Sequence, residues 1–212
     1  MRFKINTIPP RYRTRSRLEP LGCKGLQKKN DLCLVTMILH CTQKLLKELG
    51  KPYLQNSDEP TTGLGNWYAN LLTIDRRKCV MFTSEKTLYS FLIPKVRKEN
   101  LTNIVDVFLY NLNINLQAEG FPIEVICRVM QEYSDIGFAK TSSKQVLGSM
   151  NELAFQYQNV IVKHFGGLES ISILGVNKEI NRTIMGGIKY LHPIEALREF
   201  LTGERQQRYK SI

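Results

Sequence analysis

Residues 67–93, WYANLLTIDRRKCVMFTSEKTLYSFLI, decide the fold class of this chain. They contain three runs rich in aromatic and β-branched residues: Trp67–Ile74, Lys78–Thr83 and Thr87–Ile93. Only three residues separate each run from the next, and connections this short force neighbouring strands to pair antiparallel. The stretch therefore predicts a three-stranded antiparallel meander.

The segment before the meander predicts one more strand and a short helix. Residues 32–41 are rich in Leu, Val and Ile, which predicts a buried strand and brings the sheet to about four strands. Thr42 can cap a helix that runs through Leu49 and ends at Gly50. Residues 51–66 are rich in Pro, Gly, Thr and Asn and predict a long loop.

After the meander the pattern becomes helical. Apolar residues recur three and four positions apart, so we expect helices over 101–120, from Pro122 onward, from Ser142 or Ser143 to Gly166-Gly167, and from Pro193 onward. The expected class is α+β, with a small antiparallel sheet of about four strands in the N-terminal half, packed by roughly four to five helices in the C-terminal half.

Length and composition describe an ordinary globular chain. The 212 residues are 42% apolar and 23% charged, which suits one domain. The five cysteines include no CxxC pair and the three histidines are scattered, so we expect reduced thiols and no metal site. Neither a signal-peptide core nor a membrane-length apolar run is present, which predicts a cytoplasmic protein without membrane contact.

The net charge of +11 is concentrated near the N-terminus. Residues 1–36 contain nine Lys or Arg against two acidic residues, a charge of +7, which leaves +4 for the rest. Residues 1–30 show no sustained apolar period, so we expect a basic, disordered arm before a single α+β domain of residues 31–212. Two explanations of the arm stay open: it lies along phosphates, or it is an upstream translational extension of a protein that begins at Met37.

The sequence lacks the classical catalytic motifs. It contains no Walker loop, no Rossmann glycine triplet, no HExxH motif and no nucleophile elbow. His40 and Cys41 are adjacent, and adjacent residues of a strand point to opposite faces, so they cannot form a catalytic dyad. We therefore expect no cofactor and no metal, and the sequence leaves open whether the chain is an enzyme.

Two asparagines interrupt apolar patterns. Asn70 lies within the first strand of the meander, and Asn151 lies one turn after Leu147, at the border of a helix's buried stripe. A buried amide needs hydrogen-bond partners. Each asparagine is therefore expected to be a structural clamp or part of a polar site.

Several cations and one helix start could converge on an anion. The helix that begins at Ser143 offers unpaired backbone N–H groups and a favourable dipole. The cations lie in the two meander turns and near this helix start: Arg76, Arg77, Lys86, Lys140 and Lys144. Together they predict a phosphate-binding or nucleic-acid-binding surface.

Three blocks of the sequence are distinctive: MILHCTQKLL at 37–46, LGNWYANLL at 64–72 with DRRKC at 75–79, and SKQVLGSMNE at 143–152. Together they resemble a family of bacterial domains of unknown function. The resemblance runs from Met37 to about Leu201 and includes Asn181-Arg182. Members of that family typically begin at the methionine matching Met37, which supports the upstream extension. Lys144 and Glu152 depart from the family pattern, which favours Arg and often Asp there. The family brings no established activity or cofactor.

Three functional hypotheses follow. The leading one is a bacterial cytosolic binding or regulatory module with an anionic ligand, which includes nucleic acid. The second is an enzyme with a non-classical polar site that acts on nucleotides or nucleic acid, and the third is a protein-interaction domain. The candidate ligand-binding residues are Trp67, Asn70, Arg76, Arg77, Lys86, Lys140, Ser143, Lys144 and Asn151.

Overall fold

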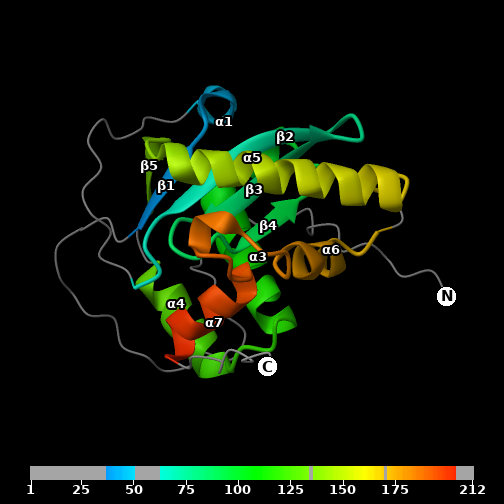
Figure 1. Ribbon diagram of the computed structural model, residues 1–212. Coiled ribbons are helices and arrows are strands. Elements are labelled where there is room, and N and C mark those ends of the chain that lie inside the picture. The colour runs from blue at the N-terminus through cyan, green and yellow to red at the C-terminus, as the bar shows by residue number, and fades with distance from the viewer. Residues whose placement is uncertain (1–36, 51–62, 134–135, 170, 204–212) are drawn as a thin grey trace.

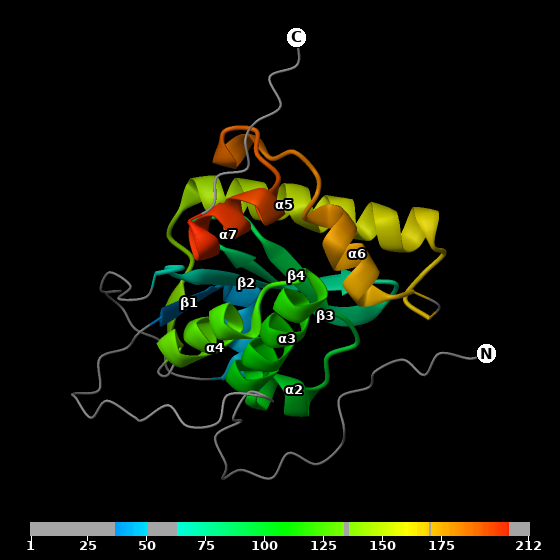
Figure 2. The ribbon, with the colours of Figure 1, turned by 90° about the horizontal axis from the view of Figure 1, so that it is seen from below.

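A mixed five-stranded sheet with helices on both faces forms the fold (Figures 1 and 2). The computed structural model describes residues 37–50, 63–133, 136–169 and 171–203. The expected basic arm of residues 1–30 and most of the expected loop of 51–66 lie outside these ranges. The strands, in the spatial order β4-β3-β2-β1-β5, are β1 Met37–Cys41, β2 Trp67–Ile74, β3 Arg77–Ser84, β4 Ser90–Ile93 and β5 Ile136–Lys140.

The predicted meander is confirmed, but the prediction that the whole sheet is antiparallel is wrong. β2, β3 and β4 pair antiparallel, whereas β1 runs parallel to both β2 and β5. A parallel pair needs a crossover connection, and α1 Gln43–Leu49 lies in the crossover between β1 and β2. The prediction also missed β5 as a strand, because its five residues IGFAK carry little strand signal of their own.

The expected order of a sheet followed by helices holds only in part. α1 precedes the meander, and β5 follows three helices: α2 Lys98–Thr102, α3 Ile104–Ala118 and α4 Ile123–Glu132. The helix predicted at the end of the chain is α7 Pro193–Thr202, and Gly203 ends it in a left-handed conformation. The long helix predicted from Ser143 is α5 Lys144–Gln158, which continues as the π-helix η1 Asn159–His164.

Two apolar clusters cover the two faces of the sheet. Side chains of β2 alternate between them: Trp67 packs against the face covered by α3 and α4, and Tyr68 against the face covered by α5 and α6 Ile173–Ile180. Both faces of β2 are therefore buried, which explains its nearly continuous apolar sequence. Figure 2 shows α3 and α4 on one side of the sheet and α5 and α6 on the other.

Aromatic rings fill the cluster under α3. Trp67, Phe82, Phe91 and Phe108 meet at ring-centroid distances of 5.1 to 5.9 Å. Burial also raises the pKa of the neighbouring Tyr133 above its usual range, although its hydroxyl accepts a hydrogen bond from Trp67 Nε1 at 2.8 Å. This core fixes the β2–β4 meander against α3, so the meander turns project from a rigid support.

Helix α6, in a stretch where no element was predicted, covers the outer edge of β4. The side chains of Asn177 and of the C-cap residue Asn181 accept the backbone N–H groups of Leu92 at 3.0 Å and Ser90 at 2.8 Å. An edge strand presents unpaired backbone groups that a helix can cover. The two asparagines are thus explained by their contacts with β4, which a local sequence pattern does not reveal.

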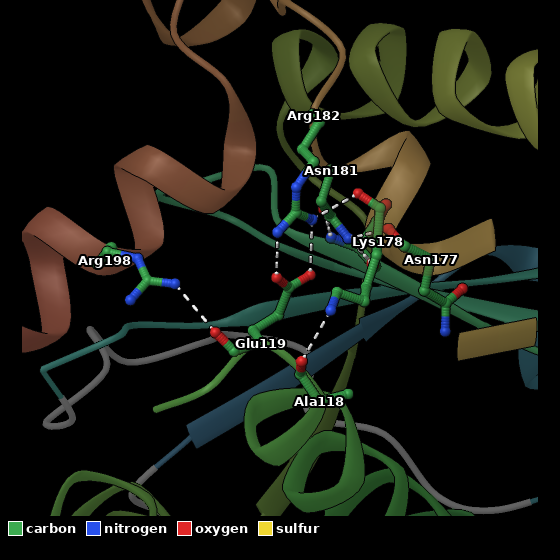
Figure 3. A network of polar contacts seen from close by, with 8 residues as sticks. Ala118, Glu119, Asn177, Lys178, Asn181, Arg182 and Arg198 are labelled. Carbon is green, nitrogen blue, oxygen red and sulfur yellow. Dashed lines mark hydrogen bonds and ion pairs between the residues drawn. The ribbon is translucent and has the colours of Figure 1, made fainter. Parts of the chain in front are cut away.

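A cluster of cations closes the C-terminal end of α3 (Figure 3). Lys178 Nζ donates to Ala118 O at 3.0 Å, and Arg198 donates to Glu119 O at 3.0 Å. The buried Glu119 carboxylate accepts two hydrogen bonds from Arg182, at 2.7 and 3.2 Å, and these raise the pKa of Arg182. Cations at a helix C-terminus stabilise its last carbonyl groups, so the cluster fastens α3 to α6 and α7.

Two of the described cysteines, Cys41 and Cys79, are free and buried. Among the described residues, no helix has the length and apolar character needed to cross a bilayer.

Candidate functional site

The tight turn between β2 and β3 carries two of the candidate cations. Asp75 and Arg76 both adopt left-handed conformations, with φ of 48° and 58°, as the two central residues of a type I′ hairpin turn do. Asp75 Oδ2 accepts the backbone N–H of Leu168 at 3.0 Å. The turn is thereby fastened to the segment after η1, while Arg76 and Arg77 stay exposed.

The segment after β4 brings further cations to the same end of the sheet. Val96 donates its backbone N–H to Lys78 O at 2.8 Å, so Lys95 and Arg97 return beside the start of β3. Glu169 approaches from the segment fastened by Asp75, and its carboxylate binds Lys95 Nζ at 3.0 Å.

These residues line a cavity of about 380 Å³, called here the basic hollow. Its lining carries five cations and one carboxylate, a net charge of +4: Arg76, Arg77, Lys78, Lys95, Arg97 and Glu169, with Val96 as the apolar member. The whole of residues 37–212 also has a net charge of only +4. The net charge of the basic hollow therefore equals the net charge of residues 37–212 as a whole.

Three guanidinium groups of the basic hollow remain available to a ligand. Lys78 binds Glu48 at 2.7 Å and Lys95 binds Glu169. Within the described ranges, the side chains of Arg76, Arg77 and Arg97 make no ion pair and donate no hydrogen bond. Since a guanidinium presents a fork of donors that matches phosphate or carboxylate oxygens, the hollow suits an anion.

The basic hollow offers little for covalent chemistry. The nearby thiol of Cys79 is buried, and burial raises its pKa, so it stays protonated and weakly nucleophilic. In the described part of the chain, His, Cys, Asp and Glu side chains do not gather into a group of three that could hold a metal ion.

Lys86 and Ser143 lie at a different place, near the other end of the hairpin strands. They line a second cavity of about 230 Å³, called here the helix-start hollow, with Glu85, Gln145, Ser149 and Gly187. The seven residue steps along β2 separate its two ends by roughly 23 Å at about 3.3 Å per residue. The structure therefore places Arg76 and Arg77 far from Lys86 and does not bring the predicted cations together.

The start of α5 is fastened in two ways. Ser143 is the N-cap residue predicted, and its hydroxyl accepts the backbone N–H of Val146 at 3.3 Å. Its own backbone N–H donates to Tyr68 Oη at 3.3 Å. Lys140 and Lys144 are exposed beside this helix start but do not line either hollow.

The remaining candidates lie apart from both hollows. Trp67 is fully buried in the aromatic core on the α3 face. Asn70 is half-buried, and its Oδ1 accepts the hydroxyl of Thr42 at 3.1 Å, as a structural clamp would. Asn151 is exposed on α5, so its expected place at the buried border is wrong.

Sequence reasoning missed Lys78, Lys95, Arg97 and Glu169. A signal existed for two of them, because the third strand of a meander ends beside the turn between the first two. Lys95 and Arg97 directly follow that third strand and were therefore bound to lie near Arg76 and Arg77. No such signal existed for Glu169, because its position depends on the long-range hydrogen bond from Leu168 to Asp75.

The fold and its hollows define a mixed α+β domain that presents a concentrated positive charge beside a β-hairpin turn. The chain belongs to the family described as domain of unknown function (DUF6933), whose model matches residues 38–196. This confirms the resemblance to a family of domains of unknown function. No curated protein and no solved structure matches the chain at a significant level.

Proposed function

We propose that the domain is a bacterial cytosolic binding or regulatory module whose ligand is anionic, with nucleic acid as the first ligand to test. One observation supports this most directly: three arginines without a side-chain partner in the described part of the chain surround a cavity with a net charge of +4. Arginine is the residue best suited to bidentate phosphate contacts.

The form of the basic hollow favours a ligand that extends beyond it. Arg76 and Arg77 are exposed at a hairpin turn, and Arg97 is exposed on the neighbouring segment. A chain of phosphates can contact such spread cations one after another, whereas a single small anion contacts one or two. This favours a polyanion such as a nucleic-acid strand.

The enzyme hypothesis has less support. Among the residues that the structure describes, Glu169 is the only carboxylate that lines the basic hollow, and it is bound to Lys95. The polar site expected around Trp67, Asn70 and Asn151 is spread over the core, a strand and an exposed helix face. For the cellular location, the free thiols of Cys41 and Cys79 favour a reducing compartment.

Binding of the full chain to DNA and RNA oligonucleotides across salt concentrations tests the proposal. For duplex DNA the logarithm of the binding constant falls with the logarithm of salt by about 0.9 per phosphate contacted. Replacing Arg76, Arg77 and Arg97 together by alanine should reduce this slope by about three. The basic residues of 1–36 are present in both proteins, so the difference reports on the hollow alone.

A matched variant removes the same charge elsewhere. Lys44, Lys47 and Lys163 are exposed on α1 and η1, outside both hollows. Their combined change to alanine should leave a larger slope than the arginine variant has. Equal slopes in the two variants, or no binding by the wild-type chain, would contradict the proposal.

A further inference from the structure

The helix-start hollow is built from three segments that are far apart in the sequence. The turn between β3 and β4 contributes Glu85 and Lys86, the first turns of α5 contribute Ser143 and Ser149, and the 3-10 helix η2 Gly186–Ile188 contributes Gly187. Gln145 joins two of these segments, because its Nε2 donates to Gly187 O at 3.2 Å.

Ser149 places an unused hydroxyl in this hollow. The residue is only 8% exposed, and within the described residues its hydroxyl makes no hydrogen bond. Its oxygen keeps contact with the open space of the hollow, unlike the hydroxyls of Thr83 and Tyr89, which are fully enclosed and unpaired within the described part of the chain. Because Ser149 lines the hollow, a ligand there could supply the missing partner.

Gly187 lies directly across from this hydroxyl. A Cβ atom placed on Gly187 would approach Ser149 Oγ to 2.8 Å and a methyl of Leu88 to 3.0 Å. Any larger residue at 187 would therefore fill the hollow and push against Ser149. Glycine keeps the space open.

Lys86 and Glu85 supply one charge of each sign. Lys86 Nζ donates to Gly63 O at 2.9 Å and lies 5.1 Å from the centre of the Phe200 ring, so the ammonium is held in place. An ammonium has three donors, so two remain for a ligand. Glu85 accepts a long hydrogen bond of 3.5 Å from Tyr68 Oη, which leaves most of its acceptor capacity unused.

We propose that the helix-start hollow binds a small zwitterion of the size of a free amino acid. Lys86, Ser149 and the unpaired N–H groups of the first turn of α5 would hold its carboxylate, and Glu85 would hold its ammonium group. A lining with no net charge suits a ligand with no net charge. At about 230 Å³ the cavity lies below the ~300–1,000 Å³ of pockets for drug-sized molecules, which favours a small ligand.

Calorimetric titration of the full chain with the free amino acids, their methyl esters and their N-acetyl derivatives tests this proposal. Some free amino acids should bind in the micromolar to millimolar range, and removal of either charge should weaken binding about tenfold or more. Inorganic phosphate should not compete. Binding of phosphate at this site would indicate a simple anion as the ligand. Methyl esters that bind as tightly as the free amino acids would indicate a simple cation, and either result would overturn the proposal.

Variants locate the site. Ser149→Ala removes the hydroxyl without breaking a described hydrogen bond and should weaken binding about tenfold. Ser142→Ala, an exposed change beside the same helix start, should bind like the wild type.

Gly187→Ala should block binding from the opposite side of the hollow. If no amino acid binds, or if Ser149→Ala and Gly187→Ala both bind normally, the proposal fails. The basic hollow is untouched by these changes, so the proposed function is tested separately.

Discussion

The side-chain amide of Asn181 makes with Ser90 the pair of hydrogen bonds that a neighbouring strand would make. Asn181 Oδ1 accepts the N–H of Ser90 at 2.8 Å, and Asn181 Nδ2 donates to Ser90 O at 2.6 Å. Both residues are fully buried. At this position of the β4 edge, the C-cap side chain of α6 takes the place of a neighbouring strand.

Asn181→Ala should destabilise the fold strongly. The change leaves the N–H of Ser90 buried without a partner, which costs about 1–3 kcal/mol. The carbonyl of Ser90 loses one hydrogen bond, worth about 0.5–1.5 kcal/mol, but still accepts the hydroxyl of Tyr157 at 3.3 Å. We expect the free energy of unfolding in urea to fall by roughly 2–4 kcal/mol. Asn151→Ala is the control, because Asn151 is exposed on α5 and should change stability by less than about 0.5 kcal/mol. Similar losses in both variants would show that the edge contact is unimportant.

The sequence predicted the parts of the fold that depend on neighbours along the chain. Trp67–Ile74 matches β2 at both ends, and Gly50 and Gly203 end helices in left-handed conformations. Parallel pairing of β1 with β2 and β5 joins residues far apart in the sequence, and no local pattern encodes it. The class was therefore predicted correctly at the level of α+β, while the sheet topology was not.

Prediction of the candidate site was limited in the same way. Arg76 and Arg77 were found because a turn is a local feature. Asn151 was misplaced because the buried stripe of α5 runs through Met150, Leu153 and Tyr157, and a residue next to Met150 is turned about 100° from it. Spacing from Leu147, which is itself only half-buried, was a poor guide.

Glu169→Gln should strengthen anion binding in the basic hollow. The Glu169 carboxylate forms an ion pair with Lys95 Nζ at 3.0 Å, so an incoming phosphate must compete with it for Lys95. Exposed ion pairs contribute about 0.2–1 kcal/mol, so affinity for an oligonucleotide should rise roughly two- to fivefold. Glu152→Gln, an equal charge change on the exposed face of α5, should raise it less. A fall in affinity on Glu169→Gln would mean that Glu169 positions Lys95 for the ligand.

Gly167→Ala should be more harmful than Gly166→Ala. Both glycines have positive φ, 132° and 74°, so either change strains the backbone. A Cβ on Gly167 would also lie 2.7 Å from Asp75 Oδ2, whereas nothing lies within 4 Å of a Cβ on Gly166. We expect Gly166→Ala to cost about 1 kcal/mol and Gly167→Ala roughly 1–2 kcal/mol more. Urea unfolding of both variants measures the difference, and equal losses would exclude the Asp75 contact as its cause.

The thiol of Cys41 should be protected while the protein is folded. Burial raises its pKa from 9.0 to about 12, so little thiolate forms at pH 8. Labelling with a thiol reagent, followed by mass spectrometry of the Cys41 peptide, should proceed only as fast as the protein unfolds. Labelling at the rate of an unfolded peptide would contradict the buried position.

The same pKa shift predicts a loss of stability in alkali. The folded pKa lies above the unfolded value, so the contribution of Cys41 to stability is complete below pH 9.0 and declines as the pH rises from 9.0 toward about 12. Melting temperatures measured between pH 8 and pH 11 should fall over this interval. In a Cys41→Ala variant, which is less stable throughout, the fall should be shallower.

The contacts of α6 with β4 also decide how this domain can join a larger β-structure. A peptide or a second copy of the chain cannot dock a strand on β4 without first displacing the side chains of Asn177 and Asn181. Strand exchange or fibril formation through β4 should therefore require that α6 first separates from the sheet.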